Sequence, residues 1–107
     1  MVIITRHADN RLRKRLNLKR KSHQHHIELV LKKGIRHAEL AGQIKRFIDK
    51  RVMVDTADTL IVYNYYVYCF IKQTEVLLTV FELPKELKSK YESIKRKHEE
   101  AINHGTI

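Results

Sequence analysis

Hydrophobic residues change their spacing once along this chain, close to residue 50. Before that point they recur every three or four residues, as at Ala8 and Leu12, which is the spacing of amphipathic helices. After it, apolar and β-branched residues come in short runs at 59–64, 66–71 and 75–81, which is typical of β-strands. Helices followed by strands within 107 residues predict a single domain of the α+β class.

The same pattern predicts how the elements are arranged. We expect N-terminal helices packed on a three- to four-stranded antiparallel sheet, with a C-terminal helix after Pro84. The domain spans residues 1–107, of which 1–84 form the core and 85–107 the C-terminal helix. The expected helices and the edge strand that precedes them cover residues 2–4 (strand), 5–18, 22–34 and 36–49.

The strand at 66–71 carries apolar side chains on both of its faces. Tyr66, Tyr68 and Phe70 alternate onto one face, and Val67 and Cys69 point to the other. Both faces of the sheet therefore need cover, from helices or from a second copy of the chain in a homodimer. The tyrosines are interpreted as core residues, although aromatic rings beside a basic surface can also stack on bases.

Net charge narrows the choice of partner. The chain has 22 Lys and Arg against 12 Asp and Glu, a formal charge of +10, and the first 50 residues carry the whole excess. Such a charge indicates an anionic partner, and nucleic acid is the first candidate among anionic partners. One Cys excludes a disulfide framework and suits a reducing cytoplasm. No apolar run reaches the roughly 18 residues that span a bilayer, so we expect no membrane association.

The most basic part of the chain also contains a regular stripe of functional side chains. His7, Arg11 and Arg15 are four residues apart, so on a helix they lie on one face. A His can take up or release a proton near neutral pH, and Arg offers paired donors that match phosphate oxygens. These three residues are candidates for catalysis, and His37 is a fourth, although a solvated basic helix face would look the same.

A second basic segment follows directly. Arg13, Lys14, Lys19, Arg20 and Lys21 lie within nine positions and are the candidate nucleic-acid-binding residues. Contacts of this kind hold phosphates without reading a base sequence. They could equally serve solubility or bind an acidic protein.

A neighbouring group of histidines raises the question of a metal site. His23, His25 and His26 do not all share one helix face, and no Cys or paired carboxylate completes a tetrahedral set. We therefore expect no metal and no other cofactor.

Three short stretches resemble a known superfamily. They are Thr5-Arg6-His7-Ala8 with Arg11 and Arg15, Lys33-Gly34-Ile35-Arg36-His37, and the stretch from Leu78 to Pro84. In these and in element order over residues 2–84, the chain resembles the ribonuclease-like superfamily of barnase, EndoU-type nucleases, colicin ribonuclease domains and RelE-type toxins, closest to small bacterial and mobile-element members.

The resemblance implies a cytoplasmic ribonuclease toxin that cleaves RNA without a metal ion, using the ribose 2′-hydroxyl as nucleophile. The resemblance further implies RNA rather than DNA as the partner, with an antitoxin as the candidate protein partner. Two alternatives stay open: a non-catalytic nucleic-acid-binding module, and a phage or mobile-element protein that docks on an acidic host protein.

Overall fold

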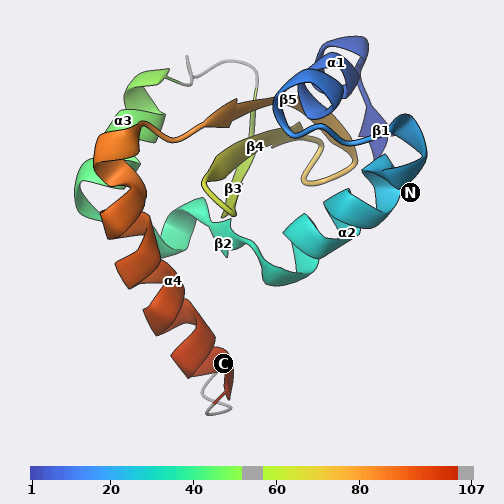
Figure 1. Ribbon diagram of the computed structural model, residues 1–107. Helices are drawn as coiled ribbons and strands as arrows, with labels where there is room; N and C mark the ends of the chain where they lie inside the picture. Colours follow the sequence, from blue (N-terminus) through green and yellow to red (C-terminus); the bar gives the residue numbers. More distant parts are fainter. Residues whose placement is uncertain (52–56, 104–107) are drawn as a thin grey trace.

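The computed structural model describes residues 1–51 and 57–103 and confirms the α+β class (Figure 1). Short 3₁₀ turns at Arg20–Ser22, His37–Glu39 and Lys85–Leu87 connect the main elements. The main elements are β1 (Ile3–Ile4), α1 (Arg6–Arg15), α2 (His23–Lys33), β2 (Ile35–Arg36), α3 (Gly42–Arg51), β3 (Thr59–Tyr63), β4 (Tyr66–Ile71), β5 (Val76–Glu82) and α4 (Lys88–Asn103).

The sheet has five strands in the order β1-β5-β4-β3-β2 and is mixed. β2 to β5 pair antiparallel, whereas β1 runs parallel to β5 with Ile3 opposite Val76. The prediction of a three- to four-stranded antiparallel sheet was therefore wrong in strand number and in the direction of β1. The unpredicted strand is β2, while β1 was expected as an edge strand over residues 2–4. Both are strands of two residues, which are too short to show an alternating pattern in the sequence.

Short turns join the strands of the meander, two residues long between β3 and β4 and four residues long (72–75) between β4 and β5. Asn64 and Tyr65 link β3 to β4 with positive φ angles of 47° and 73°, as the turn expected there requires. Lys72 and Gln73 repeat this conformation between β4 and β5, with φ angles of 53° and 64°. The meander is thus built from tight hairpins, and its register places alternate side chains on opposite faces.

Helices cover both faces of the sheet, as the apolar pattern of β4 demands. Figure 1 shows α1 and α2 on one side and α3 and α4 on the other. Tyr68 and Phe70 are buried beneath α1 and α2, and Val67 and Cys69 beneath α3 and α4. The C-terminal helix belongs to this packing, because Leu87 just before it and Tyr91 within it are buried in the second of these layers.

Two helices are shorter than the sequence pattern predicts. α1 ends at Arg15 rather than near residue 18, and Asn17 then takes a positive φ of 57° that no helix residue adopts. The helix expected over 36–49 is divided, because Gly42 has a φ of 64° and starts α3 six residues late. The end of the expected C-terminal helix beyond residue 103 lies outside the described residues.

The first turn of α1 is anchored to the sheet. Thr5 is its N-cap: the Thr5 hydroxyl accepts the Ala8 N–H at 3.1 Å and donates to the Leu78 carbonyl at 2.9 Å. Ala8 and Leu12 are fully buried below the helix. These contacts hold α1 along β5 and fix which of its flanks faces which neighbour.

Candidate nucleic-acid interface

At one flank of α1, Arg11 and Arg15 lie near Arg51, which is far from both in the sequence. Arg11 is half-buried, and the positive charges of Arg15 and Arg51 both act on it. Arg51, at the end of α3, reaches β5 from the other face of the sheet, where its guanidinium carbon lies 4.7 Å from the centroid of the Phe81 ring. Arg11, Arg15 and Arg51 are called the arginine cluster below.

The electrostatics of the arginine cluster favour a bound anion. Partial burial lowers the pKa of Arg11, and the charges of Arg15 and Arg51 lower it further, although the guanidinium stays protonated in water. In the part of the chain that the structure describes, no carboxylate pairs with any of the three. A phosphate would remove this repulsion and accept paired hydrogen bonds from each guanidinium.

His7 lies one helical turn before Arg11 on the same exposed surface. Its side chain is exposed and makes no hydrogen bond to any other described residue. His7, Arg11 and Arg15 thus all lie on α1 at the four-residue spacing that the sequence predicts for one stripe.

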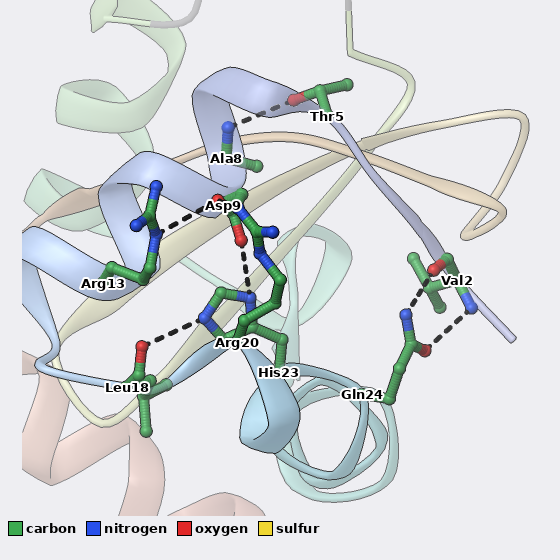
Figure 2. Close-up of polar contacts among 9 residues, drawn as sticks. All are labelled: Val2, Thr5, Ala8, Asp9, Arg13, Leu18, Arg20, His23 and Gln24. Atoms are coloured by element: carbon green, nitrogen blue, oxygen red, sulfur yellow. Dashed lines mark hydrogen bonds and ion pairs between the residues drawn. The ribbon is translucent and has the colours of Figure 1, made fainter.

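The opposite flank of α1 contains a closed polar cluster around Asp9 (Figure 2). The Asp9 carboxylate accepts from Arg13 Nε at 3.1 Å and Arg20 Nη2 at 3.3 Å, and His23 Nδ1 lies 3.1 Å away. Burial alone would raise the pKa of Asp9, but the hydrogen bond from Arg20 and the charges of Arg20, Arg13 and His23 bring it below its ordinary value.

His23 is the centre of this cluster and is 2% exposed. Its Nε2 lies 3.1 Å from the Leu18 carbonyl and its Nδ1 lies 3.1 Å from Asp9 Oδ1, so both ring nitrogens face acceptor oxygens. The ring thus ties α1, the connecting loop and α2 together. This role was not anticipated, because a His within a polar stretch gives no signal of its burial.

The basic segment divides in two as a result. Arg13 and Arg20 have Asp9 as an internal partner. Lys14, Lys19 and Lys21 are exposed and pair with no carboxylate in residues 1–51 and 57–103. Of the five candidate nucleic-acid-binding residues, only these three lysines offer uncompensated charge.

The structure does not bring His37 to the arginine cluster. His37 follows β2, which lies at the edge of the sheet opposite β1, and its Nε2 lies 2.7 Å from Asp49 Oδ1 in α3. α1 packs on the other face of the sheet. Two strands, β3 and β4, separate β2 from β5, so His37 and His7 do not form one site.

The other residues that could bind a metal or act as nucleophiles do not form a common site among the described residues. His25 is exposed, while His26 Nε2 lies 2.7 Å from the Tyr68 hydroxyl, so the three neighbouring histidines have different surroundings. Among the described residues, no three His, Cys, Asp or Glu side chains come together as a metal site. Burial raises the pKa of Cys69 to about 12, which leaves a thiol that is inert at neutral pH.

Comparison with protein-family models, with curated proteins and with solved structures finds no match to this chain. None of the described helices is long and apolar enough to cross a membrane.

Proposed function

We propose that this protein binds RNA along the edge of β5 and that the arginine cluster holds its phosphates. The observation that carries the proposal is that Arg15 and Arg51 both act on the half-buried Arg11, with Arg51 seated over Phe81 of β5 and no carboxylate paired with any of the three in the described residues. Lys14, Lys19 and Lys21 extend the positive surface beyond the end of α1. RNA is chosen over DNA because of the resemblance to ribonucleases described above.

His7 supports a further step, cleavage of the bound RNA without a metal ion. In that reaction the ribose 2′-oxygen loses its proton and attacks the adjacent phosphorus, and the 5′-oxygen leaves as it gains a proton. His7 would carry one of these proton transfers, and the arginine cluster would stabilise the charge that builds on phosphorus. The products are a 2′,3′-cyclic phosphate and a 5′-hydroxyl.

Binding without cleavage is the second candidate, and the position of His37 favours it. Cleavage of this kind uses both an acid and a base, and the structure pairs His37 with Asp49 away from His7. A binding module needs only the arginine cluster and the lysines. The two candidates share one interface and differ in whether bound RNA is cut.

Binding is tested by titrating labelled RNA at several salt concentrations. Each phosphate contact on a single strand adds about 0.7 to the slope of log affinity against log salt. Replacing Arg11, Arg15 and Arg51 with Gln should lower that slope by about 2. The matched control replaces Lys90, Arg96 and Lys97, exposed residues of α4, with the same loss of charge. Equal effects of the two triple variants would contradict the assignment to the arginine cluster.

Cleavage is tested with the same RNA in EDTA. His7→Ala should lower the cleavage rate by about 10²–10⁴-fold and leave binding almost unchanged, and 2′-deoxyribose at the cut site should block the reaction. An absence of cleavage by the wild type, or cleavage that survives His7→Ala, leaves binding as the function. If the purified protein carries an acidic protein in stoichiometric amount and no RNA, both RNA binding and RNA cleavage would be contradicted.

A further inference from the structure

A small pocket of about 300 Å³ opens directly beside the last turn of α1. Arg15, at the end of α1, and Leu16 and Leu18, from the loop that follows, line the pocket. His26, Tyr66 and Tyr68 also line it, and of these Tyr68 is itself fully buried. Ligand sites range from about 300 to 1,000 Å³, so this pocket suits one flat ring rather than a larger molecule.

The ring of Tyr66 is held in place at this pocket. Tyr66 is half-buried, and its hydroxyl donates to the Arg15 carbonyl at 3.3 Å. This hydrogen bond connects β4 to the end of α1, next to the arginine cluster. A planar ring inside the pocket would therefore meet the Tyr66 side chain, which this hydrogen bond holds, and would lie beside Arg15.

His26 leaves one polar edge available in the pocket. Its Nε2 lies 2.7 Å from the Tyr68 hydroxyl, and its Nδ1 has no hydrogen-bond partner among the described residues. Burial lowers the pKa of His26, with small further effects of the charges on His23 and His25, so the ring is neutral at physiological pH. The side-chain amide of Asn64, at the β3–β4 turn, adds a donor and an acceptor at the same pocket.

We propose that this pocket receives one unpaired base of the bound RNA, whose backbone phosphate lies on Arg15. The Tyr66 ring packs on the base, and His26 and Asn64 contact its edge. This inference rests on the proposed RNA binding and defines its substrate class, single-stranded RNA. In a duplex every base is stacked and paired, and taking one out costs binding energy.

The experiment scans a labelled 12-nucleotide single strand with one abasic site at each position in turn. At one position, loss of the base should weaken binding by between about five-fold and a hundred-fold, the range measured for single base–aromatic contacts. Tyr66→Leu, which keeps apolar bulk beside the core, should weaken binding of the intact strand by a similar factor. Combined with the abasic strand, it should add little further loss.

Tyr65→Leu is the matched control, because Tyr65 is the neighbouring half-buried tyrosine on the opposite face and its hydroxyl is bound to Glu92 instead. It should leave the abasic effect intact. A second measurement needs no variant: 2-aminopurine placed at the sensitive position should change its fluorescence on binding to the wild type, and at other positions it should not.

The outcomes separate this inference from the proposed function. Equal affinity for the single strand and for a duplex of the same sequence, with no position sensitive to base loss, contradicts the base pocket and leaves phosphate binding standing. A wild type that binds neither RNA at low salt contradicts both.

Discussion

Gly34 ends α2 at a point where a side chain has no space. An alanine Cβ at this position would lie 2.2 Å from Ile61 Cγ2 and 2.5 Å from the Val30 carbonyl oxygen. Normal contact distances are about 3.5–4.0 Å. Ile61 is fully buried in β3, and the Val30 oxygen is backbone that already accepts the Gly34 N–H at 2.8 Å. Neither neighbour can move cheaply, so something in the α2–β3 packing must shift.

Overpacking of a buried site costs about 1–3 kcal/mol, and more where the neighbours are rigid. We therefore expect Gly34→Ala to lower the free energy of unfolding by about 3 kcal/mol, out of a total of about 5–15 kcal/mol for a domain of this size. Urea unfolding followed by far-UV circular dichroism measures this free energy. The slope of the unfolding free energy against urea concentration should be the same for the variant and the wild type, which would show that the folded and unfolded states keep their compactness.

Gly42 provides the comparison, because a side chain at this position would strain the backbone and would not clash with neighbouring atoms. It has a φ of 64°, and an added Cβ would meet nothing within 4 Å. Gly42→Ala should cost only the backbone strain, about 1–2 kcal/mol. Ile61→Ala should partly relieve the clash at Gly34 and should be additive with Gly42→Ala. If Gly34→Ala costs no more than Gly42→Ala and shows no coupling to Ile61, the steric argument is wrong.

Two further predictions concern polar contacts that tie the helices to the rest of the chain. Because the pKa of Asp9 is lowered in the folded state, its stabilising effect is complete above its ordinary value of 3.8 and is lost as pH falls through the lower folded value. Urea unfolding should thus show an advantage of wild type over Asp9→Asn at pH 6 that shrinks towards pH 2, and a constant difference would argue against the cluster. Tyr91→Phe removes the hydroxyl that accepts the Asn64 N–H at 2.9 Å and should cost about 1 kcal/mol, measured in the same way. No loss of stability would mean that α4 is not fastened to the β3–β4 turn by this bond.

Local signals in the sequence were enough to predict most of the regular structure. The alternation in β4 places Tyr68 and Val67 on opposite faces, and the turn at Asn64 follows from residue preference alone. The direction of β1 could not be obtained in this way, because Ile3 pairs with Val76 across most of the chain. A strand of two residues carries too little pattern to choose its partner.

The candidate site was predicted less completely, because it depends on which elements meet. The four-residue spacing of Arg11 and Arg15 follows from helix geometry, but Arg51 joins them only because Phe81 in β5 faces the end of α3. The sequence offers His37 as a second catalytic candidate beside His7, but the strand order places it at the edge of the sheet opposite β1. A count of charged residues also could not show that Arg13 forms an ion pair with Asp9 and is therefore not free to bind phosphate.

The short length of β1 has a consequence for self-association. β1 pairs only with Val76 and Leu77, so within the described residues the later part of β5 has no strand on that side. An unpaired strand edge is a template on which a second molecule can add a strand, and proteins commonly protect such edges with charge. Arg51 lies over Phe81 at this edge and Arg11 is close by, so two copies meeting there would bring like charges together. Replacing these arginines to test RNA binding therefore also removes a barrier to aggregation, and light scattering belongs beside every binding curve of that variant.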